Sequence, residues 1–179
     1  MSAALGMAAV PADGAALTTA QATACPTGWG SLGKTVASTT TAPLTDIRTG
    51  RHACYDRMVF DIPGGGDGLG YWVGYVDHLY QDGSGRLIPV GGGAVIEVRV
   101  AAPGYDPETG APTYPGRAGR PLPGTDLTGY RTFRDTRFAG SFEGETQIGL
   151  GVRARLPFRV LQLNDRVVVD VAHNWTGAR

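Results

Sequence analysis

The chain has 179 residues, and its 16 basic and 16 acidic side chains give a formal net charge of zero at pH 7. This balance provides no overall field that would attract nucleic acid, so nucleic acid is excluded as an expected partner. The 28 glycines and 12 prolines indicate many turns between short elements. With 42% hydrophobic residues, the chain can bury the core of one domain.

The first 24 residues have the composition of an export leader. They contain no Lys or Arg, and Ala22-Thr23-Ala24 matches the small-residue pattern of a cleavage site. We interpret residues 1–24 as a signal or leader segment and residues 25–179 as one folded domain; a disordered Ala/Thr-rich leader is the alternative. No stretch is apolar over the roughly 18 residues that a membrane-spanning helix needs. We expect a secreted or cell wall-associated protein.

The chain has two cysteines, and an even number in an exported protein favours a disulfide. We predict a Cys25–Cys54 bond; lipidation of Cys25, which would make the protein a lipoprotein, and two free thiols are the alternatives. The histidines at 52, 78 and 173 and the two cysteines lack the spacing of a metal site. We therefore predict no metal and no cofactor.

Strands are predicted wherever apolar residues recur at every second position. In the clearest case Met58, Phe60 and Ile62 share one face, and Arg57 and Asp61 share the other. Strands are predicted over residues 44–52, 56–62, 71–79, 94–101, 130–139, 147–156, 157–163 and 166–173. The pattern favours a single all-β domain, an antiparallel β-sandwich or flattened barrel of about eight strands.

Three segments lack a strand pattern. The Ser/Thr-rich segment 33–43 is expected to be a flexible strap, and the glycine-rich segment 63–70 is expected to be mobile. The longest segment, 102–127, is rich in Pro and Gly and is either a functional loop or a disordered one.

Asp170 shares a predicted strand face with Val168 and Ala172, which suggests that its carboxylate is partly buried. A buried carboxylate needs a partner, and Arg57 on a neighbouring strand would supply it. A structural ion pair between Arg57 and Asp170 is favoured over a ligand-binding role for these residues.

A stripe of arginines and aromatic residues over 130–138 is the candidate ligand-binding surface. Aromatic rings stack on sugar faces, and guanidinium groups bind carboxylates in a bidentate way. The candidate ligand-binding residues are Arg131, Phe133, Arg134, Arg137, Arg153 and Arg155. The alternative is an amphipathic strand whose charges prevent edge-to-edge pairing.

Glu143 and Glu145 alternate with uncharged residues, so on a strand their carboxylates would share a face about 7 Å apart. Paired carboxylates can hydrolyse glycosidic bonds, which makes a glycan hydrolase a remote alternative. A solvated hairpin edge is the favoured interpretation. No serine lies in a nucleophile-elbow pattern, and we predict no enzyme.

Several stretches of the mature chain are similar to a known family. They are CPTGWGS (25–31), LTDIRTGRHACYDRMVFD (44–61), GYWVGYVD (70–77), YRTFRDTRFAGSFEGETQIGLGVRARLPFRV (130–160) and RVVVDVAH (166–173). The chain resembles the AMIN-like domain of secreted actinobacterial proteins. The resemblance implies a secreted or wall-associated β-sandwich without known catalysis. AMIN domains proper occur in envelope proteins such as amidases and secretins, where they look like modules that target peptidoglycan.

The sequence is therefore interpreted as a non-catalytic envelope-binding module that recognises peptidoglycan or another wall glycan. The alternative is a protein-interaction or scaffolding domain of the envelope, which would bind a partner segment along an exposed strand edge.

Overall fold

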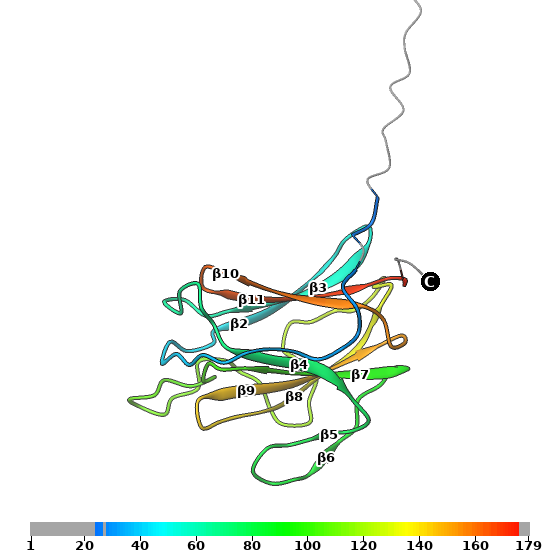
Figure 1. Ribbon diagram of the computed structural model, residues 1–179. Coiled ribbons are helices and arrows are strands. Elements are labelled where there is room, and N and C mark those ends of the chain that lie inside the picture. Colours follow the sequence, from blue (N-terminus) through cyan, green and yellow to red (C-terminus); the bar gives the residue numbers. More distant parts are fainter. Residues whose placement is uncertain (1–23, 27, 176–179) are drawn as a thin grey trace, which may run out of the picture.

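The computed structural model describes residues 24–26 and 28–175, in which eleven strands form two facing antiparallel sheets and a small hairpin (Figure 1). The five-stranded sheet contains, in spatial order, β1 (Lys34–Val36), β4 (Tyr71–Val76), β7 (Ala94–Val100), β9 (Glu145–Val152) and β8 (Phe133–Phe142). The four-stranded sheet contains β10 (Phe158–Leu163), β11 (Arg166–Ala172), β3 (Tyr55–Asp61) and β2 (Asp46–Arg51). The hairpin contains β5 (Leu79–Tyr80) and β6 (Leu87–Ile88). Of the segment 1–24 that we interpret as a leader, residues 1–23 lie outside the described residues.

The alternating side chains of the two sheets meet in one core. Met58 and Phe60 on β3 are fully buried and face the five-stranded sheet, which contributes Ile96, Ile148 and Leu150. The predicted all-β sandwich is confirmed, and it is not a closed barrel. Sequence alternation did not predict β1, which lies within the segment expected to be a flexible strap, or the short β5–β6 hairpin. No helix of the described chain is long and apolar enough to span a membrane.

The β5–β6 hairpin packs on the outer face of the five-stranded sheet, below it in Figure 1. Gly149 on β9 makes this packing close, because a Cβ there would lie 2.5 Å from Leu79 Cδ2. A Cβ at Gly151 would lie within 1.8 Å of the Gly91 carbonyl oxygen. The glycines that alternate with Ile148 and Leu150 thus make room for a second layer.

The long segment 102–127 is an ordered cover and not a disordered loop. Tyr114 and Leu122 lie in the core with 4% and 2% of their surface exposed. The backbone N–H of Gly119 donates to the Phe138 carbonyl, and Phe138 N–H donates to the Arg120 carbonyl. These hydrogen bonds protect the edge strand β8 from pairing with another chain.

The glycine-rich segment 63–70 is joined to the β10–β11 turn. The Gly66 N–H donates to Asp165 Oδ1 over 2.8 Å, and the Asp165 N–H donates to the Gly66 carbonyl. Leu69, with 1% of its surface exposed, fixes the end of the segment in the core.

Candidate binding surface

The two phenylalanines of the predicted arginine and aromatic stripe are buried, and its Tyr130 is only partly exposed. Phe133 has 1% of its surface exposed and lies in the core, stacked on Tyr130 at 5.8 Å between ring centroids. Phe138 is also buried, at 6% exposed. The assignment of Phe133 to a ligand-binding surface is therefore wrong, because its ring cannot reach a ligand.

The five arginines predicted with Phe133 each contact other parts of the protein. Arg131 donates to the Ala53 carbonyl, and Arg134 donates to the carbonyls of Tyr130, Arg131 and Phe133. Arg137 pairs with Asp135, Arg153 donates to the His173 carbonyl, and Arg155 donates to Ser31.

A different set of arginines converges on the outer face of the four-stranded sheet. Strand register places Arg159 of β10 and Arg57 of β3 on either side of Asp170 of β11. The Asp170 side chain is fully buried and accepts hydrogen bonds from Arg57 Nε at 2.7 Å, Arg57 Nη2 at 2.9 Å and Arg159 Nε at 2.8 Å. The expected Arg57–Asp170 pair is thus present and has a second arginine. We call these three residues the Asp170 trio.

Aromatic rings surround the Asp170 trio. The Arg159 guanidinium carbon lies 4.4 Å from the Trp29 ring centroid and 5.4 Å from that of Tyr55. Arg57 lies 5.3 Å from the same Tyr55 ring, and its guanidinium also donates to the Tyr55 hydroxyl. Cation–π contacts and the shared carboxylate hold both guanidiniums in fixed orientations.

The disulfide brings Trp29 to this face. Cys25 and Cys54 are bonded, as predicted, across a sequence separation of 29 residues. The bond places the start of the domain beside the β2–β3 turn. The described chain contains no free cysteine. The Phe158 N–H donates to the Gly30 carbonyl, which also ties this segment to the start of β10.

A second trio lies further along the same face. Asp61 of β3 accepts hydrogen bonds from Arg48 Nε at 2.5 Å, Arg48 Nη2 at 3.0 Å and Arg166 Nε at 2.9 Å. Hydrogen bonds from Arg48, and to a smaller extent from Arg166, lower the pKa of the Asp61 carboxyl below its ordinary value. We call these residues the Asp61 trio.

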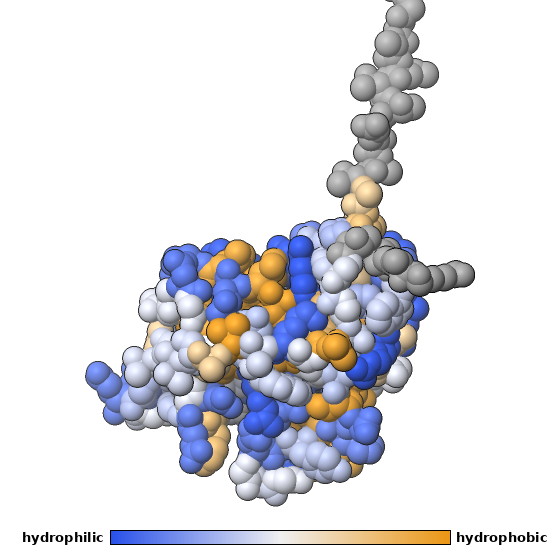
Figure 2. Space-filling view, viewed as in Figure 1, coloured by the Kyte–Doolittle hydropathy of each residue, from blue (hydrophilic) through white to orange (hydrophobic). Residues whose placement is uncertain are grey.

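The face as a whole is positive and only partly apolar. Its four arginines outnumber Asp46, Asp61 and Asp170 by one among the described residues, and the side chains of Arg48 and Arg166 are each 52% exposed. Val59, Leu161 and Val168 separate the two trios. Hydrophilic and hydrophobic patches are mixed on the layer that contains this sheet (Figure 2). A charged, aromatic-bordered sheet face of this kind suits an extended polar ligand.

The predicted turn between β10 and β11 is enough to place Arg159 beside Asp170 from the sequence. A two-residue turn at Asn164-Asp165 places Leu163 opposite Arg166, and counting along both strands places Arg159 opposite Asp170. The predicted hairpin therefore implies the second arginine of the Asp170 trio, although Arg159 was not among the predicted site residues. The position of Trp29 has no such signal, because it depends on the tertiary path after the disulfide.

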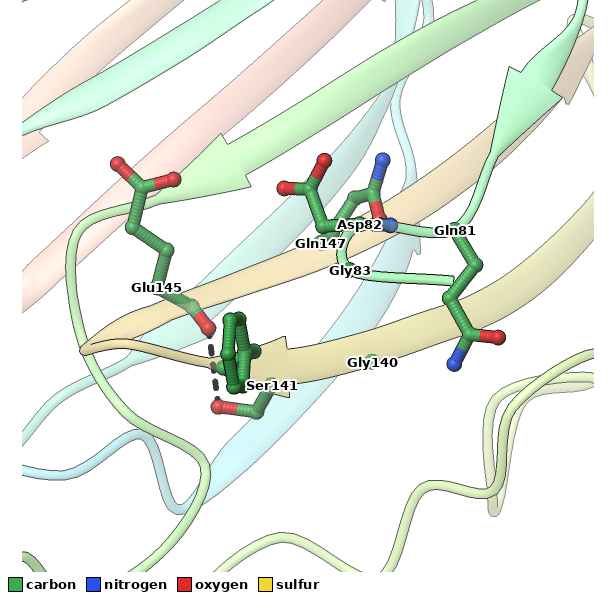
Figure 3. Close-up of a pocket in the computed structure, with 8 residues that line it drawn as sticks. Gln81, Asp82, Gly83, Gly140, Ser141, Glu145 and Gln147 are labelled. Carbon is green, nitrogen blue, oxygen red and sulfur yellow. Dashed lines mark hydrogen bonds between the residues drawn. The ribbon is translucent and has the colours of Figure 1, made fainter. Parts of the chain in front are cut away.

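The opposite sheet carries a hollow of about 200 Å³ between the β5–β6 turn and the β8–β9 hairpin. Gln147 crosses its floor, accepting from the Asp82 N–H and donating to the Tyr80 carbonyl and to Glu97. Figure 3 shows Asp82 beside Gln147, and Ser141 Oγ donating to the Glu145 carbonyl. The amide that crosses this floor is therefore engaged within the protein.

The two glutamates near this hollow are exposed at the β8–β9 hairpin, as the favoured interpretation predicted, and do not lie together on one strand. Glu143 is in the β8–β9 turn with a φ of 49°, and Glu145 is the first residue of β9. The strand spacing that suggested a catalytic carboxylate pair is therefore wrong. The described residues contain no group of three or more His, Cys, Asp or Glu side chains arranged to hold a metal ion.

A disulfide-bonded β-sandwich that holds charged side chains in place on one sheet face is typical of a binding module. Residues 42–173 match the family model of the AMIN-like domain, and the chain belongs to this family. Neither the curated proteins nor the solved structures contain a significant match. Family membership and the disulfide indicate an envelope-associated, extracytoplasmic interaction module. The matched region includes both trios, whereas Cys25 and Trp29 precede it.

Proposed function

We propose that this protein is a non-catalytic module that binds peptidoglycan or another wall glycan through the outer face of the β10–β11–β3–β2 sheet. The observation that carries the proposal is the Asp170 trio with its rings: Trp29 and Tyr55 border Arg159 and Arg57 over a buried carboxylate. The rings offer stacking surfaces for sugars, and the arginines offer hydrogen-bond donors for their acidic substituents.

The rigidity of the trio supports a binding role. Asp170 and the rings fix both guanidiniums before a ligand arrives, which reduces the side-chain entropy lost on binding.

Arginine contacts lower the pKa of Asp61, so this carboxyl stays ionised at neutral pH. An ionised carboxylate cannot serve as the general acid that glycoside hydrolysis requires.

Pelleting with purified cell walls tests the proposal. We expect the wild-type protein to be retained at low salt and the Arg159→Gln variant to be retained several-fold less. Arg117→Gln is the matched control, because Arg117 is exposed on the 102–127 cover and away from this sheet. Equal retention of all three proteins, or no retention of the wild type, would refute a glycan site on this face.

An interaction with an envelope protein is the second candidate, and a different surface favours it. Large hydrophobic side chains are exposed around the hairpin and hollow: Trp72 at 38%, Tyr80 at 52%, Leu87 at 50% and Phe142 at 57%. Capture of one stoichiometric protein partner, lost in a Phe142→Ser variant and retained in Arg159→Gln, would support this function over glycan binding.

A further inference from the structure

The two trios together specify the chemistry of the ligand. We infer that the four-stranded sheet binds a linear polyanion, whose phosphate or carboxylate groups contact the Asp170 trio and the Asp61 trio at the same time. This inference rests on the proposed function and narrows it from wall glycans in general to anionic wall polymers.

Each trio presents arginine donors to an anion. The Asp170 trio has one unbalanced positive charge, and in the Asp61 trio the second arginine is balanced by Asp46, which lies 4.0 Å from Arg48. In both, a single aspartate accepts hydrogen bonds from two arginines. Arg159 and Arg166 each use only Nε for the aspartate, and no other described residue accepts a hydrogen bond from their terminal nitrogens. Those planar N–H groups match the bidentate geometry of phosphate and carboxylate.

Each aspartate holds the guanidinium groups of two arginines in fixed positions. Asp170 is fully buried, so it fixes Arg57 and Arg159 while remaining out of reach of a ligand. Asp61 is 18% exposed and lies between two arginines that are each 52% exposed. At the Asp170 trio an approaching anion therefore meets guanidinium groups before it meets carboxylate, whereas at the Asp61 trio the exposed carboxylate of Asp46 lies beside Arg48.

The spacing of the trios excludes a single small anion as the full ligand. Arg166 and Asp170 are four residues apart on β11, and Arg57 and Asp61 are four apart on β3. At about 3.3 Å per residue the two receptors lie about 13 Å apart. One phosphate cannot reach both, but a polymer with repeated anionic groups can, and linked contacts multiply the affinity.

The surface between the trios is apolar on β10, β11 and β3, and on β2 the row continues to Arg48, which lies opposite Val59. Val59, Val168 and Leu161 occupy the row that separates them, and Val168 is 1% exposed. A neutral part of the polymer can lie over this row without leaving an unpaired charge. Each bound unit would therefore consist of two anionic groups joined by a neutral spacer.

Binding to defined polymers tests the inference. The two polyanion probes are polyphosphate and polygalacturonate. Inorganic phosphate is the probe with a single anionic group, and dextran is the neutral polymer. We expect both polyanions to bind, inorganic phosphate to bind at least about 100-fold more weakly, and dextran not to bind by this face. The relative affinity of the two polyanions separates phosphate from carboxylate recognition.

The decisive variant replaces Arg159 and Arg166 together with glutamine. Asp170 keeps Arg57 and Asp61 keeps Arg48, so neither carboxylate loses all of its partners. The matched control replaces Arg117 and Arg120, which changes the charge equally on the 102–127 cover. We expect about tenfold or greater loss of polyanion affinity in the first variant and less than about twofold loss in the control. Circular dichroism and thermal melting verify the fold of both.

Intact walls and walls stripped of their anionic polymers separate the two proposals. Retention on intact walls that falls on stripped walls supports the inference. Equal retention on both overturns it while leaving glycan binding in place, and no retention on either refutes both. Equal polyanion affinity in the Arg159/Arg166 variant and its control also overturns the inference.

Discussion

The indole of Trp29 lies over the guanidinium of Arg159, with Cζ 4.4 Å from the ring centroid. The two residues are far apart in the sequence, and Trp29 lies outside both sheets. The contact holds Arg159 in place, and Arg159 has more unused hydrogen-bond donors than Arg57. Substitution of Trp29 is therefore expected to affect the Asp170 trio.

Trp29→Ala is expected to weaken wall retention without unfolding the protein. The change removes a cation–π contact of about 0.5–1 kcal/mol and a stacking surface for the ligand. Trp72→Ala, on the five-stranded sheet, is the matched control and should retain wild-type wall binding. Pelleting assays at several salt concentrations measure both variants, and equal losses would show that the rings act only on stability.

Replacing Cys25 and Cys54 with serine is expected to reduce the free energy of unfolding by about 3–4 kcal/mol. The bond closes a loop of 29 residues in the unfolded chain, and its loss restores that chain entropy. Urea unfolding measures the change. The wild type with reductant should match the double variant, and a reductant effect in the variant itself would contradict this explanation.

Asp61 is expected to make stability depend on pH in the acidic range. Its folded-state pKa lies below the ordinary 3.8, so its stabilisation is present above that value and is lost as the pH falls through the lowered pKa. Asp61→Asn should be about 1 kcal/mol less stable than wild type at pH 7, with solvent screening included, and the difference should shrink progressively as the pH falls below 3.8. Urea unfolding over a series of pH values measures it. A difference that stays constant as the pH falls would contradict this explanation.

Buried Tyr114 and partly buried Tyr75 are expected to respond oppositely to loss of the hydroxyl. Tyr114 has a buried hydroxyl without a hydrogen-bond partner among the described residues, and burial raises its pKa far above the usual range. The Tyr75 hydroxyl donates to the Leu156 carbonyl and accepts from the Leu156 N–H, both at 2.7 Å. Tyr114→Phe should be neutral or stabilising, and Tyr75→Phe should cost about 1–2 kcal/mol. Thermal melting of both variants measures the difference.

Sequence alternation predicted the sheets well where strands are regular and failed where they bulge. On β3 it assigned Met58 and Phe60 to the core and Arg57 and Asp61 to the outer face, as observed. On β8 it suggested a surface stripe, but register shifts after Phe133 and after Phe138 interrupt the period of two. A bulge adds a residue to one strand, so residues of odd spacing can face the same side.

Only half of the binding surface could be predicted from local patterns in the sequence. Burial of Asp170 followed from its apolar neighbours on the strand face, and Arg57 followed from the need for a partner. The Asp61 trio combines β2, β3 and β11, so it required the order of strands in the sheet. That order is a property of long-range pairing, which no local pattern specifies.

The placement of β11 between β10 and β3 has a consequence for the order of folding. Arg57 and Asp170 are 113 residues apart, and β3 lacks its neighbour on one side until β11 has been synthesised. Contacts of such high sequence separation form slowly because a large loop must close first. During synthesis the β2–β3 hairpin therefore lacks β11 beside it until every strand of the five-stranded sheet has been made, and pairing with β11 is a late step in the assembly of the domain.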